Sequence, residues 1–160
     1  MGSYDCKVYC LNATTGGFLW SYPTGNYVFS SPAVAGGRVY VGSYDCKVYC
    51  LNATTGGFLW SYPTGNYVFS SPAVAGGRVY VGSYDTKVYC LDAPTGGCLW
   101  SYTTESGVHS SPAVAGGRVY VGSYDWKVYC LNATTGGLLW NYLTGGAVYT
   151  SSPAVAGGRV

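Results

Sequence analysis

Apolar and aromatic side chains occur in runs of five or six residues, and short polar or glycine-rich turns separate the runs. One unit of the chain holds four of them: SPAVA at 31–35, RVYVGS at 38–43, KVYCL at 47–51 and FLWSY at 58–62. Short runs rich in Val, Tyr and Trp that end at turn residues predict β-strands. No segment has the spacing of apolar residues that an amphipathic helix requires. The pattern therefore predicts an all-β fold.

The two middle runs carry apolar or aromatic side chains at successive positions, and so on both faces of a strand. A sheet that is apolar on both faces must lie between two others, as the four-stranded antiparallel blades of a β-propeller do. The small side chains of SPAVA suit a crowded innermost strand near an axis, and the large ones of FLWSY suit the outer rim. We therefore predict a β-propeller in which each unit forms one blade.

The unit recurs with a fixed period of 40 residues. Residues 2–41 and 42–81 are identical, residues 82–121 differ at a few positions, and residues 122–160 contain one extra residue. A period of this length indicates a solenoid, a propeller or another array. We expect residues 1–160 to form a single propeller domain of four repeats.

Composition narrows the classes of partner. Charged residues make up 9 % of the chain and the net charge is +2, with no basic stripe, so we expect no nucleic-acid partner. No apolar run approaches the ~20 residues that span a bilayer, so we expect no membrane partner. Met1 leads into the middle of a repeat, without a signal peptide, which suggests a fragment of a longer natural array or an engineered chain. The compartment stays open, including an extracytoplasmic or cell-surface parent protein.

Seven cysteines are present, which is an odd number. Cys10, Cys50, Cys90 and Cys130 recur at one place in the repeat, and we interpret them as small buried apolar residues rather than as disulfide or zinc ligands. Cys90 and Cys98 flank one predicted turn, and the sequence leaves open whether they pair.

One motif is written four times: CLNATTGGFLW at 10–20 and 50–60, then CLDAPTGGCLW at 90–100 and CLNATTGGLLW at 130–140. It resembles the tryptophan-docking motif, A-x-D-x-x-T-G-x-x-x-W, of the propeller repeats of the pyrroloquinoline-quinone (PQQ) dehydrogenases, and the resemblance covers essentially the whole chain. The first copy departs from it at Cys10 and Asn12, whereas Asp92 keeps the acid. The resemblance implies that each tryptophan lies flat between blades, over the Thr-Gly turn of its neighbour. The docking residues expected on this basis are Trp20, Trp60, Trp100 and Trp140 with Thr15, Gly16, Thr55, Gly56, Thr95, Gly96, Thr135 and Gly136.

The resemblance also implies what an active quinoprotein would need: a catalytic aspartate, a calcium site and a basic residue at the quinone. None of these maps onto this chain. Asp5, Asp45, Asp85 and Asp125 are one turn residue in four copies, and we interpret them as hairpin-turn residues. We therefore predict no catalytic residue, no cofactor and no metal site. The favoured function is a non-catalytic structural or interaction scaffold, and a PQQ-dependent oxidoreductase is the least favoured.

The copies differ mainly in two loops, one between the second and third strands and one after the fourth, and in a propeller both open on the same face. This face contains a set of candidate binding residues: Trp126, His109, Glu105, Tyr27, Tyr67 and Tyr149. An aromatic rim suits a glycan or a peptide, and unconstrained drift of the loops is the alternative. As metal ligands, His109 and Glu105 lack a third partner.

Asn12, Asn52 and Asn132 each begin an Asn-Ala-Thr sequon for N-glycosylation. The docking motif accounts for an amide at the same position, so the sequon only weakly suggests an exported parent protein.

Closure of the ring is the remaining question. The resemblance implies about seven or eight blades, so four blades would form a half-ring with two exposed apolar ends. Two copies would then close an eight-bladed homodimer, and the alternative is a closed four-bladed monomer. Residues 151–160 and 1–22 would together complete one blade, within one chain in the monomer or between partners in the dimer. We favour the dimer.

Overall fold

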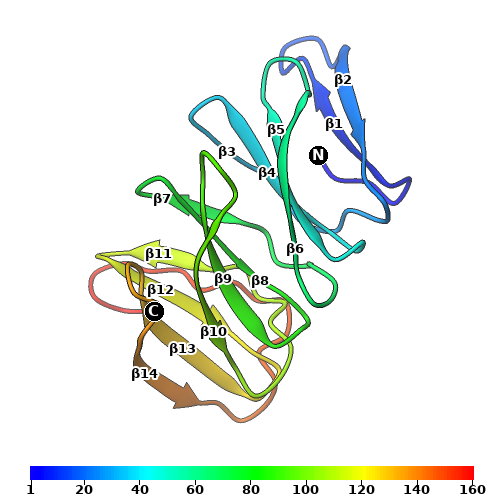
Figure 1. Ribbon diagram of the computed structural model, residues 1–160. Coiled ribbons are helices and arrows are strands. Elements are labelled where there is room, and N and C mark those ends of the chain that lie inside the picture. Colours follow the sequence, from blue (N-terminus) through cyan, green and yellow to red (C-terminus); the bar gives the residue numbers. More distant parts are fainter.

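The fold is known from a computed structural model that describes all residues of the chain, and it consists of strands without helices (Figure 1). The strands are β1 Lys7–Leu11, β2 Phe18–Pro23, β3 Ala33–Ala35, β4 Arg38–Ser43, β5 Lys47–Asn52, β6 Phe58–Pro63, β7 Ala73–Ala75, β8 Arg78–Gly82, β9 Lys87–Asp92, β10 Cys98–Thr103, β11 Ala113–Ala115, β12 Arg118–Gly122, β13 Lys127–Asn132 and β14 Leu138–Leu143. No helix of the structure is long and apolar enough to cross a membrane.

The strands form four antiparallel sheets in chain order. Three are complete blades, β3-β4-β5-β6, β7-β8-β9-β10 and β11-β12-β13-β14, and the fourth holds only β1 and β2. The register repeats from blade to blade: Tyr40 lies opposite Cys50, and Tyr80 lies opposite Cys90. The predicted all-β architecture of four-stranded antiparallel blades is therefore confirmed, with one blade incomplete.

The chain forms an open arc, with the sheet β1-β2 and the sheet that ends in β14 at opposite ends (Figure 1). Residues 151–160 contain only an isolated bridge, Ala156 to Arg159, and do not pair with β1 or β2. The structure of the single chain thus differs from the alternative of a closed four-bladed monomer, and the half-blade lacks its two inner strands.

The short strands β3, β7 and β11 are innermost. Each begins its sheet, and β7 contacts both β3 and β11 of the neighbouring blades. Just before these strands, the Ser31 N–H donates to Ser71 Oγ at 2.8 Å, and the Ser71 N–H donates to Ser111 Oγ at 2.9 Å. Only three residues of SPAVA form ladder bonds, because the preceding proline has no N–H to donate.

The core lies between the blades. Strands β4 and β5 are buried at nearly every position, as expected for a sheet covered on both faces. Gly42 allows a close approach between blades: a Cβ there would lie 2.3 Å from Cγ1 of Val68. Val41, Val48 and Val81 are fully buried in this packing.

Candidate functional site

Three tryptophans lie between successive blades in one repeated geometry. The Trp60 indole N–H donates to the backbone oxygen of Ala93 at 3.1 Å, and its ring lies against Gly96, where a Cβ would be 2.6 Å from the indole. Trp20 has the same relation to Ala53 and Gly56, and Trp100 to Ala133 and Gly136. A large flat ring on a glycine buries much area and fixes the angle between blades.

The Thr-Gly turn beneath each indole is held by the residue that begins it. Asn52 Oδ1 accepts the N–H groups of Thr54 and Thr55, both at 2.9 Å. Gly56 follows with φ of +71°, a conformation that costs a side chain energy but not glycine. Asn12 and Asn132 make the same bonds, and Asp92 bonds Thr95. These contacts account for the amide at the three sequons without invoking a glycan.

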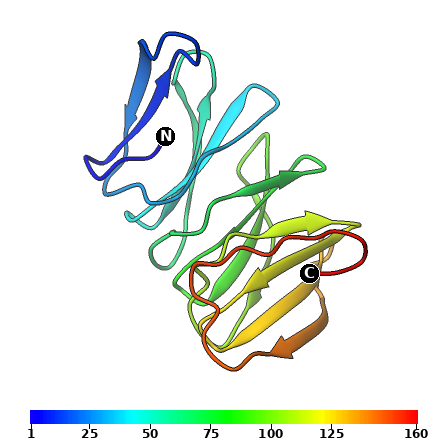
Figure 2. The same cartoon turned by 180° about the vertical axis from the view of Figure 1, so that it is seen from behind.

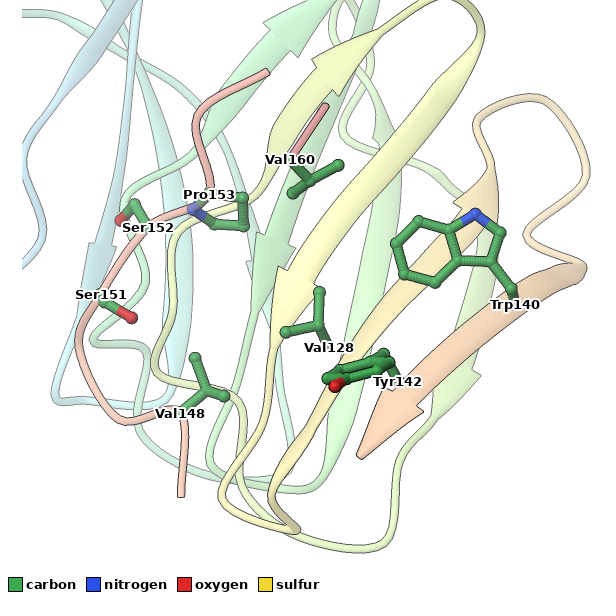
Figure 3. A pocket seen from close by; sticks show the side chains of 8 residues that line it. All are labelled: Val128, Trp140, Tyr142, Val148, Ser151, Ser152, Pro153 and Val160. Carbon is green, nitrogen blue, oxygen red and sulfur yellow. The ribbon is translucent and has the colours of Figure 1, made fainter. Parts of the chain in front are cut away.

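The two ends of the arc lack one half of this geometry each. Trp140 is 40 % exposed and its indole N–H donates no hydrogen bond, whereas Trp20 and Trp60 are each 8 % exposed. Figure 3 shows Trp140 and Tyr142 on strand β14, beside a cavity of about 310 Å³ that the chain's last residues help to line. At the other end, no atom lies within 4 Å of a Cβ placed on Gly16. One end therefore presents an indole without a turn, and the other presents a turn without an indole.

The last ten residues run beside the terminal blade (Figure 2). Ala156 and Arg159 exchange two backbone hydrogen bonds, of 3.1 and 2.9 Å. Ala35 and Arg38 are paired in the same way at the start of the β3-β4 hairpin. At the N-terminal end, a cavity of about 290 Å³ lined by Val8, Trp20 and other apolar residues lies beside the half-blade.

The repeated aspartates link neighbouring blades. Asp45 Oδ2 accepts the backbone N–H of Gly25 at 2.7 Å and the hydroxyl of Tyr49 at 2.5 Å. Asp85 and Asp125 make equivalent pairs of bonds. Burial and this carboxylate raise the pKa of Tyr49 above its usual value, so the phenol stays protonated and donates. Asp5 accepts the Tyr9 hydroxyl but no backbone N–H from a neighbouring loop, because no blade of the chain precedes it.

The two variable loops lie side by side, since the Tyr44 N–H donates to the Tyr27 backbone oxygen at 2.8 Å. The six candidate binding residues nevertheless fall into two groups: a first group of four residues in an aromatic cluster, and a second group of two residues that lie apart from it. His109 and Tyr149 face each other with ring centroids 5.3 Å apart, and Tyr27 and Tyr67 each pack on Tyr44. Glu105 instead forms an ion pair with Lys127, and Trp126 is half exposed in a hairpin turn.

An inner row of aromatic rings, which sequence reasoning missed, accompanies the first group. Phe29, Phe69, His109 and Tyr149 occupy one position in successive loops, and their successive ring centroids are 5.0, 4.3 and 5.3 Å apart. Tyrosines from the hairpin turns pack against this row: Tyr4, Tyr44, Tyr84 and Tyr124. An alignment of the four repeats would have revealed this position. The prediction was based on differences between the repeats, and it therefore included only His109 and Tyr149.

His109 is buried within this row, at 7 % exposure. Its Nδ1 lies 3.4 Å from the Tyr124 hydroxyl, and its Nε2 has no hydrogen-bond partner. Burial lowers the pKa of His109 from its usual value, because the charged imidazolium loses its water.

The protein should therefore lose stability in mild acid. The unfolded chain binds a proton at His109 near the usual pKa of 6.5, while the folded chain does not until the pH is lower. The free energy of unfolding should decrease as the pH falls below that value and towards the folded pKa. Urea unfolding between neutral pH and mild acid measures this slope. His109→Phe, which repeats the residue at positions 29 and 69, should flatten it, and an unchanged slope in that variant would contradict the assignment.

The cysteines are all free thiols. Cys90 lies opposite Trp100 in the ladder and Cys98 lies opposite Leu91, so the two side chains that flank the turn do not face each other and do not pair. Burial raises the pKa of Cys50 and Cys90 to about 11, which leaves both thiols protonated and unreactive.

Comparison with known proteins finds one matching family model and several solved structures with a similar fold. A family model described as outer membrane protein assembly factor BamB, of the PQQ repeat type, matches residues 1–68 and 48–160. BamB from Moraxella catarrhalis superposes with a TM-score of 0.76 and 22 % identity, over 88 % of this chain and 44 % of that one. The computationally designed Ika8 protein gives a TM-score of 0.86 at 20 % identity, over 97 % of this chain and 48 % of that one. The quinohemoprotein alcohol dehydrogenase ADHIIG from Pseudomonas putida HK5 gives 0.75 at 22 %, over 86 % and 31 %. The chain thus spans less than half the length of each of these three proteins.

Proposed function

Because this chain belongs to the β-propeller family described by the assembly factor BamB, with repeats of the type found in PQQ dehydrogenases, we propose that it is a non-catalytic interaction scaffold. Its working form is an eight-bladed ring of two copies. The observation that carries the proposal is the match between the open ends, since Trp140 lacks a turn to dock on and Gly16 lacks an indole.

The contacts inside the arc specify what the junction between copies would contain. By the repeat, the Trp140 indole N–H would donate to Ala13 of the second copy, as Trp100 donates to Ala133. The Tyr120 hydroxyl would add a bond of the kind that Tyr80 makes to Ala133 at 3.1 Å. The N–H of Gly145 would donate to Asp5 of the second copy, as Gly65 donates to Asp85 at 2.6 Å.

The C-terminal segment adds a strand exchange to this junction. Residues 151–160 already form the start of a blade's first hairpin, and the half-blade β1-β2 lacks its inner strands. In a ring of two copies each segment would pair along β1 of the other copy. The contact is head to tail, and such contacts close into rings when the rotation per copy divides a full turn. The superposition on about half of longer propeller chains supports a half-turn.

Apolar surface at the open end supplies the driving force. All six residues of β14 are exposed, whereas β6, at the same place in an inner blade, buries Trp60. Covering an aromatic side chain stabilises an interface by about 1.5–3 kcal/mol.

The acidic side chains support a role without catalysis. Asp45, Asp85 and Asp125 bridge blades, Asp92 holds its turn, and Glu105 pairs with Lys127. A general acid or base needs a carboxyl group free to exchange protons with a substrate. A scaffold function also agrees with the family's description as an assembly factor.

The absolute mass in solution tests the proposal. Light scattering during size exclusion should give twice the chain mass of 16.8 kDa, unchanged on dilution through the micromolar range. A mass of one chain at all concentrations would refute closure by a second copy, and a broad series of larger masses would mean open filaments instead.

A further inference from the structure

The inner edge of the variable face is hollowed. A cavity of about 430 Å³, here called the inner cup, lies where three connections between blades approach the innermost strands. Its lining combines aromatic rings with hydroxyl groups and holds no charged side chain: Phe29, Phe69, Ser71, His109, Ser111, Tyr149, Thr150 and Ser152. Thr150 belongs to the segment that carries the extra residue of the fourth repeat.

The rings are spaced so that a ligand must lie across them. Phe29, Phe69 and His109 follow one another at centroid distances of 5.0 and 4.3 Å, which is the contact distance of aromatic pairs. No slot exists between them for a flat heterocycle. A ring with an apolar C–H face can instead cover their exposed parts.

The hydroxyls provide donors in fixed positions. Ser71 Oγ accepts the Ser31 N–H and Ser111 Oγ accepts the Ser71 N–H, so both oxygens are held by backbone groups. Neither hydroxyl donates a bond within the chain, although each carries one proton. They can therefore donate to an acceptor in the inner cup.

His109 supplies the strongest sign of a missing partner. The side chain is more than nine-tenths buried, and its Nε2 makes no hydrogen bond. Buried polar atoms in folded proteins are almost always paired, because an unpaired one destabilises the folded chain. Neighbouring atoms cover Nε2 in this conformation, so a ligand hydroxyl would pair with it only after the imidazole turns towards the inner cup.

We propose that the inner cup binds a neutral saccharide, with one sugar ring against Phe29 and Phe69 and its hydroxyls bonded to Ser71, Ser111 and His109. Absence of charge in the lining favours an uncharged ligand, and a few placed polar groups on an aromatic wall are typical of small-molecule sites. The residues proposed to contact the sugar lie outside the exchanged segment 151–160 and all come from one chain.

The only histidine of the chain gives a direct readout, since its ring protons yield NMR signals with no competitor. Titration with glucose, N-acetylglucosamine and cellobiose, each to about 50 mM, should shift these signals saturably with at least one sugar, at a dissociation constant of about 1 mM or below. Ser111→Ala should weaken that binding about fivefold or more. Indole, a flat aromatic probe, should leave the signals in place.

Three further measurements make the result decisive. His109→Phe, followed by calorimetry, should lose the binding, and Glu105→Gln, on the same face but outside the inner cup, should keep it. Trp140→Ala should also bind normally, which separates this site from ring closure. Absence of any shift with all three sugars, a shift with indole alone, or undiminished binding by His109→Phe would each overturn the proposal.

Discussion

Replacing Trp140 with alanine should convert the two-copy ring into single arcs. The indole is 40 % exposed in the single chain, so its removal costs the isolated arc little. In the ring the same indole would lie on Gly16 of the second copy, and both junctions would lose it at once. Truncating a buried aromatic anchor at an interface costs about 2–4 kcal/mol, so two junctions together should weaken dimerisation by about a thousandfold or more. Light scattering at micromolar concentration should then report one chain mass of 16.8 kDa.

Leu99→Ala is the control, because Leu99 is also exposed but lies on strand β10, in a blade away from both ends. It should leave the mass unchanged. Gly16→Ala tests the other side of the junction: φ of +69° strains the alanine locally, but its methyl group meets nothing in the single chain, while the equivalent position at Gly56 lies 2.7 Å from an indole. The junction would be disproved if Trp140→Ala and Gly16→Ala both kept the mass of two chains.

Much of this architecture can be predicted from the sequence, because contacts between residues close in the chain determine it. Glycine pairs, such as the one before Arg38, must form tight turns, so strand β4 begins where the pattern placed it. Asn52 bonds the backbone of its own turn, which sets the Thr-Gly geometry without help from distant residues. The runs at 38–43, 47–51 and 58–62 were predicted within one residue, whereas the strand in SPAVA begins two residues later than predicted.

Features that depend on contacts between blades of the chain were harder to predict. Comparison of the repeats pointed to His109 because it differs, yet its neighbours Phe69 and Tyr84 are repeat residues that gain importance only through stacking. Glu105 is four residues from His109 in sequence but turns to Lys127, a partner in the next blade. Spacing along the chain carries no information about such pairs.

Near-identical repeats also explain why the ends matter so much. Each blade presents a docking tryptophan to one neighbour and a Thr-Gly turn to the other, so every junction inside the chain pairs an indole with a turn. Trp140 cannot dock on the first Thr-Gly turn of its own chain, because an arc of this curvature keeps its ends apart (Figure 1). The proposed self-association would follow directly from repetition combined with an incomplete turn.

Trp60→Ala should produce the largest loss of folding stability of any single substitution at the docking positions. Its indole is 8 % exposed, packs on Gly96 and donates to Ala93, and it joins the two complete blades β3–β6 and β7–β10. Removal leaves a cavity and takes one of two donors from the Ala93 oxygen, which keeps the Tyr40 hydroxyl, and buried Trp→Ala changes cost about 3–5 kcal/mol. Urea unfolding at one protein concentration should show this decrease in the free energy of unfolding.

Two comparisons decide whether docking causes that loss. Trp60→Phe keeps an aromatic ring but removes the N–H bond to Ala93, so it should cost clearly less than Trp60→Ala. Trp140→Ala, measured in a dilute solution where arcs are separate, makes the same chemical change within the same repeat motif and should cost under about 1 kcal/mol. Trp60 and Trp140 occupy the same position of the repeat and the same place in a strand, so the two sites differ mainly in whether a neighbouring blade is present. Equal losses at Trp60 and Trp140 would therefore show that the indole stabilises its own strand rather than the junction between blades.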